Sequence, residues 1–270
     1  NDMPTPPATP MDQLSAAQLA KEIASPYLWR RQTAQRLLTE RQDKSAAPAL
    51  EKLVRESKHA EAVVPALYTL DALNELTAET LKSALANSEP SVRVHALRIA
   101  DRRFTDESLL EAAIAMVDDR DATVQLQLAM SLGESQDKRV VPALAKLARE
   151  RGQVDWMPDA ILSSLSGRAG AMLVEILREP DLGQAGRLLE PLCTAIASRR
   201  DVDELSAALV QIAATQDAQS QRSCLQGLRS GFSQPTAMTL SDPARAALKS
   251  LVASSESNVH AAAESLAGVL

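Results

Sequence analysis

A two-helix pattern recurs along almost the whole chain. The clearest copy of its second helix is SVRVHALRIADRR (residues 91–103), in which Val92, Ala96 and Ala100 fall on one apolar stripe at helical spacing. Pro90 precedes this copy, and proline both ends a preceding helix and suits the first turn of the next. The pattern therefore predicts two helices that meet at a tight corner.

Equivalent positions of successive second helices lie 30 to 33 residues apart until an insertion at residues 232–243 lengthens the last step. These positions are Ala34, Ala66, Ala96, Leu128, Ile161, Cys193, Cys224 and Ala262. A helix-pair repeat of this length is typical of a solenoid, because one pair cannot bury its apolar face alone. We predict an all-α, right-handed α-solenoid of about eight antiparallel helix pairs over residues 14–270.

The composition supports helices and excludes two classes of protein. Hydrophobic residues make up 45% of the chain but aromatic residues only 2%, whereas strand-rich cores draw on aromatic and β-branched side chains. The net charge of -6 argues against broad nucleic-acid binding, which needs a clustered positive surface. No apolar run reaches the roughly 18 to 20 residues that cross a bilayer, so we expect no membrane-spanning segment.

Residues 1–13, NDMPTPPATPMDQ, contain four prolines and no periodic apolar pattern. They predict a disordered, proline-rich linker in front of the solenoid. The chain begins at Asn1 without an initiator methionine, from which we expect a mature form or a piece of a longer protein.

Two motifs resemble the HEAT-repeat family. The first is V-P-A-L-x-x-L at residues 141–147, and the second is V-R-x-x-A-L at residues 92–97. The resemblance implies that Arg31 and Arg93, at equivalent positions of their second helices, bond to carbonyls or to an acidic residue of the adjacent turn.

Residues 25–168 carry a narrower resemblance, in the succession SPYLWRRQTAQRLL, ALYTLDALNEL, VRVHALRIADRR and VQLQLAMSLGES. This order is similar to the HEAT segment of large exported bacterial proteins that also contain a sugar-dehydrogenase-like β-propeller and a c-type cytochrome domain. The chain has neither the haem-binding C-x-x-C-H motif nor a propeller, so neither activity is implied for it. The resemblance implies a spacer between such domains and an exported or periplasmic location.

Polar side chains on consecutive second helices form the expected binding surface: Tyr68, Asp71, His95, Arg98, Asp101 and Arg102. We predict that Trp29, Tyr68, His95, Arg98 and Arg102 contact a protein or a neighbouring domain of the same polypeptide, with the chain as a monomeric, non-catalytic scaffold. Two alternatives stay open: the patch is a solvated face with scattered ion pairs, and Trp29 caps the exposed end of the core.

The sequence offers no pattern for catalysis or metal binding. The three histidines, His59, His95 and His260, have no ligand spacing, and none precedes a glutamate as in the iron-binding HEAT hydroxylases. No Ser-His-Asp set, glycine-rich phosphate loop or specific pair of carboxylates occurs. We therefore expect no enzyme activity, no cofactor and no metal.

Two rival functions are considered. A HEAT-like nucleic-acid-binding protein or DNA glycosylase would use a tryptophan and an aspartate, for which Trp156 with Asp155 and Asp159 are the candidates. The acidic total and the lack of a lysine and arginine stripe disfavour this function. A lyase-type HEAT subunit that binds a chromophore is the other.

Cys193 and Cys224 occupy matching positions in neighbouring repeats. Stacked helices lie about 8 to 10 Å apart, whereas a disulfide needs Cα atoms within roughly 7 Å. We therefore predict two buried free thiols that act as small apolar residues.

Overall fold

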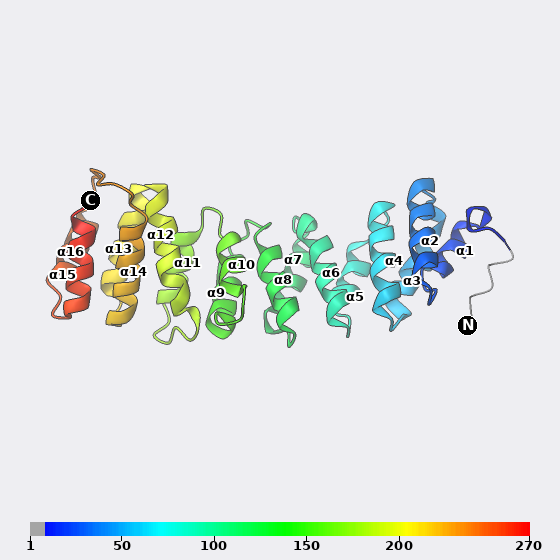
Figure 1. Ribbon diagram of the computed structural model, residues 1–270, viewed down its shortest axis with the longest axis horizontal. Helices are drawn as coiled ribbons and strands as arrows, with labels where there is room; N and C mark the ends of the chain where they lie inside the picture. Colours follow the sequence, from blue (N-terminus) through cyan, green and yellow to red (C-terminus); the bar gives the residue numbers. More distant parts are fainter. Residues whose placement is uncertain (1–8) are drawn as a thin grey trace. The chain divides into compact units, whose positions relative to one another are not determined.

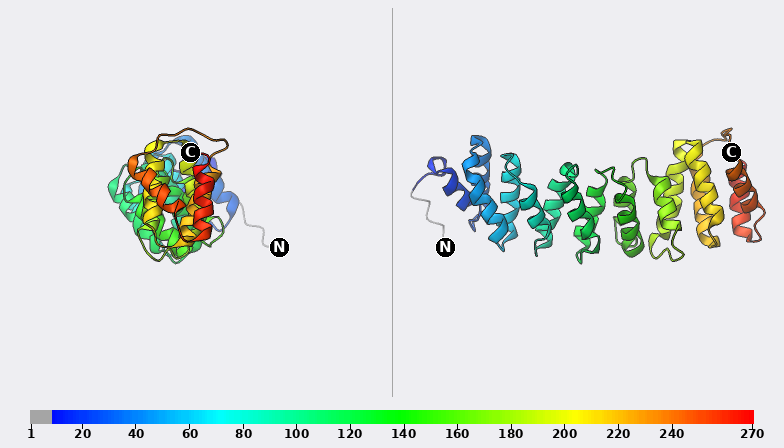
Figure 2. Two further views of the ribbon diagram at one scale, coloured as in Figure 1. Left: turned by 90° about the vertical axis from the view of Figure 1, so that its left-hand side faces the viewer. Right: turned by 180° about the vertical axis from the view of Figure 1, so that it is seen from behind.

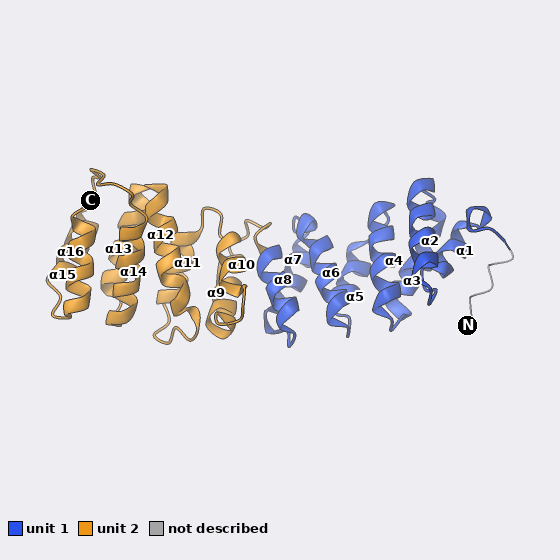
Figure 3. Ribbon diagram, in the orientation of Figure 1, with its two compact units in different colours: residues 1–131 blue, residues 132–270 orange. Residues whose placement is uncertain are grey.

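The computed structural model describes residues 9–270, which form sixteen α-helices and no strand (Figure 1). They divide into two compact units, residues 1–131 and residues 132–270 (Figure 3). Sixteen helices make eight consecutive pairs, so the predicted all-α repeat is confirmed. In each unit the helices follow one another pair by pair, as the rear view in Figure 2 also shows.

The first unit contains the first four pairs. Their helices are α1 (Ala16–Glu22), α2 (Leu28–Arg41), α3 (Ala47–Glu56), α4 (Ala60–Ala72), α5 (Ala78–Leu85), α6 (Pro90–Ala100), α7 (Glu107–Ile114) and α8 (Ala122–Leu132), whose last residue begins the second unit. Short 3-10 helices cover Met11–Gln13, Lys44–Ala46, Asp101–Arg103 and Ala115–Asp118. First helices stack on first helices, as α3 does on α1 and α5, and α4 stacks between the second helices α2 and α6.

The second unit contains the other four pairs. Their helices are α9 (Val140–Arg151), α10 (Met157–Ser163), α11 (Ala169–Leu177), α12 (Leu189–Arg199), α13 (Val202–Ala214), α14 (Ala218–Ser230), α15 (Asp242–Val252) and α16 (Ser257–Ala267), with a 3-10 helix at Ala185–Leu188. The same layering recurs: α11 packs between α9 and α13, and α14 between α12 and α16.

The core consists of the repeated apolar positions. Val92, Ala96, Leu97, Ile99 and Ala100 of α6 are all buried, as the stripe predicts. The aligned positions of the other second helices, from Ala34 to Cys224, are also fully buried.

The alignment is wrong by one residue in the last repeat. Ala263 is fully buried there, and Ala262 is partly exposed. The alignment of the earlier copies depends on their spacing of 30 to 33 residues, and the insertion at residues 232–243 changes that spacing before the last copy.

The predicted boundary of the linker is also too late. Met11 is buried within the 3-10 helix Met11–Gln13, and Arg41 of α2 donates hydrogen bonds to the carbonyls of Asp12 and Leu14. The 3-10 helix Met11–Gln13 thus packs against the first pair. The remainder of the predicted linker, residues 1–8, lies outside the described residues.

Five of the corners inside the pairs share one arrangement: a polar side chain at the fourth position of the second helix bonds to carbonyls at the end of the first helix or in the turn after it. Arg31 donates to the carbonyls of Ser25 and Pro26, and Arg93 donates to those of Asn87 and Ser88. The predicted role of both arginines is confirmed. The same place is taken by Gln125, Gln221 and His260, which bond to the carbonyls of Val117, Ile212 with Thr215, and Val252. These contacts supply hydrogen-bond donors to carbonyls at or just beyond the end of a helix, where the intrahelical hydrogen bonds stop.

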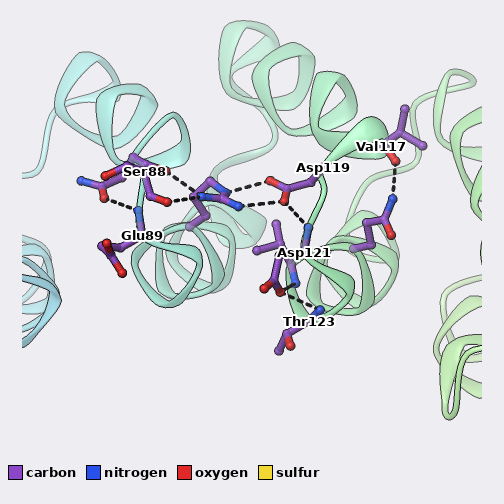
Figure 4. Close-up of polar contacts among 10 residues, drawn as sticks. Ser88, Glu89, Val117, Asp119, Asp121 and Thr123 are labelled. Carbon is purple, nitrogen blue, oxygen red and sulfur yellow. Dashed lines mark hydrogen bonds and ion pairs between the residues drawn. The ribbon is translucent and has the colours of Figure 1, made fainter.

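Arg93 goes further than its equivalents (Figure 4). Its guanidinium also makes a two-pronged ion pair with Asp119, at 2.7 and 2.8 Å, across to the corner of the next pair. The Asp119 carboxylate in turn accepts a hydrogen bond from the amide of Asp121, the residue before α8. One side chain therefore links two consecutive corners and fixes the spacing of α6 and α8.

Candidate functional site

The polar second-helix surface of the first unit begins with a side-chain pair. Tyr68 projects from α4 and His95 from α6, and the Tyr68 hydroxyl lies 3.0 Å from Nδ1 of His95. Their rings meet edge to face, with centroids 5.5 Å apart and an interplanar angle of 80°. Both residues are half-buried, so the pair is held between two stacked helices and presents one edge outward.

Burial sets the protonation of both members. It lowers the pKa of His95, and the positive charge of Arg98 lowers it further. Burial also raises the pKa of Tyr68, against the opposing effect of Arg98 and Arg102 and with the support of Asp71 and Asp101. At neutral pH the pair is therefore an uncharged imidazole beside an uncharged phenol.

Two exposed arginines flank this neutral pair. Nε of Arg98 donates to Oε1 of Gln127 on α8 at 2.8 Å, and Nε2 of Gln127 donates to Oγ of Ser131 at 3.1 Å. Gln127 and Ser131 are buried, so one edge of the Arg98 guanidinium is anchored to the next helix while its side chain stays exposed. Arg102 is exposed and makes no hydrogen bond or ion pair within residues 9–270.

The acidic members of the predicted surface are partly neutralised. Arg103 forms an ion pair with Asp71 and donates to the carbonyl of Leu76 at 2.7 Å. Arg103 thus ties the 3-10 helix after α6 back to the end of α4. The charges near Tyr68 and His95 are then the guanidiniums of Arg98 and Arg102 together with the carboxylate of Asp101.

Four of the five predicted contact residues come together, and the fifth lies apart. Trp29 is in the first turn of α2, 48% exposed, with the guanidinium of Arg30 5.7 Å from the ring centroid. Arg30 is held there by Glu22 of α1 through two hydrogen bonds of 2.6 Å. Among the described residues, Trp29 has no hydrogen bond or ring contact to Tyr68 or His95, and its role in binding stays a prediction.

Gln127 is the member that the sequence did not identify. It lies 32 residues after His95, at the equivalent position of the next second helix. The 32-residue spacing could have identified Gln127 as a neighbour of this surface, because equivalent positions of adjacent second helices lie side by side in a solenoid.

The tryptophan considered for base excision lies in the second unit. Trp156 precedes α10 with a φ of 67° and is 73% exposed. Asp155 and Asp159 are exposed as well, and in the described part of the chain no hydrogen bond joins either of them to Trp156.

The second unit contains an open apolar cavity of about 830 Å³ between α10, α11 and α12. Leu162, Leu165, Pro191 and Ala195 line it, and the exposed Arg187 lies at its margin. The cavity arises because α10 has only seven residues against eleven in α12, so α10 leaves part of the α12 surface uncovered.

Within residues 9–270, no group of three or more His, Cys, Asp or Glu side chains could hold a metal ion. In the same range, no helix is both long and apolar enough to span a bilayer.

Stacked helix pairs with a polar surface on their second helices define a helix-pair repeat protein, an α-solenoid. Residues 78–156, from α5 to the residue before α10, match the family described as HEAT repeats. This segment contains Arg93, Asp119 and three of the clustered surface residues, His95, Arg98 and Arg102.

Two of the solved structures that match the chain are engineered proteins. An engineered protein from a structural genomics consortium is 19% identical with a TM-score of 0.38, over 93% of this chain and 77% of its own. A designed armadillo repeat protein is 16% identical with a TM-score of 0.31, over 95% of this chain and all of its own. A search of curated proteins finds no match.

Proposed function

We propose that the chain is a non-catalytic scaffold or spacer that binds a partner protein, or a neighbouring domain of the same polypeptide. The contact surface is the cluster of Tyr68, His95 and Arg98 on the second helices of the first unit, with Arg102 on the 3-10 helix that follows α6. The observation that carries the proposal is the placement of two exposed guanidiniums around a rigid, uncharged tyrosine–histidine pair.

The chemistry of this cluster suits recognition. Tyrosine and arginine are the side chains that most often dominate protein interfaces, and their cost of immobilisation is small where the free protein already holds them in place. Tyr68 is held by His95, and Arg98 by Gln127. A partner with carboxylates facing Arg98 and Arg102 would form ion pairs with these two guanidiniums.

The test compares two double variants as bait. Wild-type chain and Arg98→Ala/Arg102→Ala are used to capture proteins from the cell of origin, with captured proteins quantified by mass spectrometry. We expect a protein that the wild type captures and the double variant loses, with only a small fall in melting temperature, because both side chains are exposed and the single hydrogen bond from Arg98 to Gln127 is lost.

Arg36→Ala/Lys52→Ala is the matched control. It removes the same charge from the same unit, at side chains that are 62% and 69% exposed in surface ion pairs. This control should retain the captured protein. Loss of stability in Arg98→Ala/Arg102→Ala with undiminished capture would remove the cluster as the contact surface.

The larger context is a second part of the proposal. The succession of motifs in residues 25–168 supports a spacer within an exported protein that also carries a propeller and a cytochrome domain. Sequencing the complete reading frame tests this directly. A neighbouring domain with C-x-x-C-H is the expected result, and a reading frame with neither domain contradicts it.

A further inference from the structure

Two buried thiols of the second unit lie against each other. Cys193 of α12 and Cys224 of α14 are both free and fully buried, as the sequence predicts. They nevertheless interact with each other across the two stacked helices α12 and α14, since the Cys224 side chain raises the pKa of Cys193. The spacing of 8 to 10 Å assumed for stacked helices had implied that they would stay apart.

The reason for the contact is glycine on α14. Gly227 lies one turn after Cys224, and a Cβ there would be 2.2 Å from the carbonyl oxygen of Glu190 and 2.8 Å from Cβ of Cys193. A Cβ on Gly231, one turn further, would lie 2.5 Å from Cβ of Ala197. The backbone of α12 therefore occupies space that side chains on α14 would need. Glycine at this spacing allows two helix backbones to approach closely.

We infer that Cys193 and Cys224 are a disulfide-forming pair that cross-links α12 to α14 when the chain folds in the presence of a low-molecular-weight disulfide such as glutathione disulfide. One cysteine thiolate attacks the oxidant and forms a mixed disulfide, and one glutathione leaves. The second cysteine thiolate then displaces the other glutathione and closes the protein disulfide. Two cysteine thiols are oxidised and release two protons, and one glutathione disulfide is reduced to two glutathione molecules.

The native fold controls when this reaction takes place. The neighbouring Cys224 side chain and burial raise the pKa of Cys193 well above its ordinary value. The thiolate is the attacking species, and a raised pKa leaves little of it, so the buried pair in the folded protein reacts slowly with the oxidant. The disulfide therefore forms during folding, or when the pairs that contain α12 and α14 separate transiently.

The cross-link would act on the stacking of repeats and not on the binding surface of the first unit. It would join the second helices of two adjacent pairs, so neither pair could separate from the other while the bond persists. Disulfides persist where the environment is oxidising. The pair would thus make the stability of the second unit depend on the redox state of its compartment.

The test measures closure of the bond at defined redox potential. Reduced, unfolded chain is refolded in mixtures of reduced and oxidised glutathione, quenched by alkylation and weighed intact by mass spectrometry. We expect one intramolecular disulfide, and an equilibrium constant for closure at least about tenfold higher in native buffer than in concentrated urea, a difference of about 30 mV. The oxidised chain should also unfold at a higher urea concentration than the reduced chain.

Two variants serve as controls. Cys193→Ser should take up at most one glutathione and form no internal bond. Gly227→Ala, which pushes the two helices apart, should lower the closure constant toward the value in urea; the comparison of wild-type chain in buffer and urea stands without this variant. Closure no more favourable in buffer than in urea, a stable mixed disulfide with glutathione, or only intermolecular disulfides would each overturn the inference.

Discussion

Arg93 shows how much of this fold depends on single polar side chains. Its guanidinium serves four acceptor atoms: the carbonyls of Asn87 and Ser88 and both oxygens of Asp119. The two charged side chains are only 14% and 10% exposed. Removal of one partner would leave the other charge nearly buried and unpaired, which costs more than the intact pair contributes.

Arg93→Ala should therefore lower the free energy of unfolding of the first unit by about 2 to 3 kcal/mol at neutral pH. Urea titration followed by circular dichroism measures the effect. Arg102→Ala is the control, because that exposed arginine, in the 3-10 helix after the other end of α6, has no hydrogen bond or ion pair within residues 9–270. Equal losses in both variants would contradict the structural role of the ion pair.

The same variant has a pH signature. Burial acts to raise the pKa of Asp119, but hydrogen bonds from Arg93 and from the amide of Asp121 outweigh it and hold the pKa below its ordinary value. A lowered carboxyl pKa stabilises the fold above the unfolded value of about 4 and loses that contribution as the pH falls through the folded pKa. The difference between wild type and Arg93→Ala should thus shrink below about pH 4.

The candidate surface was predictable where it follows the repeat, and not where it depends on side-chain conformation. Tyr68, His95 and Arg98 come together because they lie on adjacent second helices, and Arg102 follows directly after α6. Trp29 is in a second helix too, but it occupies the first turn of α2, beside Arg30. The Gln127 anchor depends on the reach of the Arg98 side chain, which no periodicity in the sequence specifies.

At the scale of elements, α12 and α14 form a contact of unusual closeness. Gly227 and Gly231 face the α12 backbone at positions where a Cβ would overlap with it. The repeat period predicted that these two helices stack, and the buried positions confirm it. Their separation was not predictable from the period, because it is set by the absence of two side chains and not by the apolar pattern.

Gly227→Ala should destabilise the second unit by about 1 to 3 kcal/mol, because the nearest obstacle is a backbone carbonyl that cannot rotate away. Gly186→Ala is the matched control: a Cβ there meets no atom within 4 Å, so stability should stay nearly constant. Urea titration of both variants, made under reducing conditions, separates this packing effect from disulfide formation. Equal stability of the two variants would show that α12 and α14 can separate without cost.

At the scale of the whole molecule, a solenoid differs from a globular domain because each pair contacts only its neighbours. The stability of such a chain is approximately a sum of repeat terms and nearest-neighbour interface terms. A substitution in one pair should therefore destabilise that pair and its neighbours and leave distant pairs unchanged. Each compact unit contains one residue whose substitution tests this: Arg93 in residues 1–131 and Gly227 in residues 132–270.

Hydrogen exchange measured by mass spectrometry tests this locality in one experiment. Arg93→Ala should accelerate exchange in peptides from α5 to α7, by about tenfold for each 1.4 kcal/mol lost, and leave peptides from α13 to α16 protected. Gly227→Ala should accelerate exchange in peptides from α13 to α16 and leave peptides from α5 to α7 protected, because a Cβ at residue 227 would overlap with the neighbouring helix α12. If either variant instead accelerates exchange equally in peptides from both units, the chain unfolds as one cooperative body and the nearest-neighbour description fails.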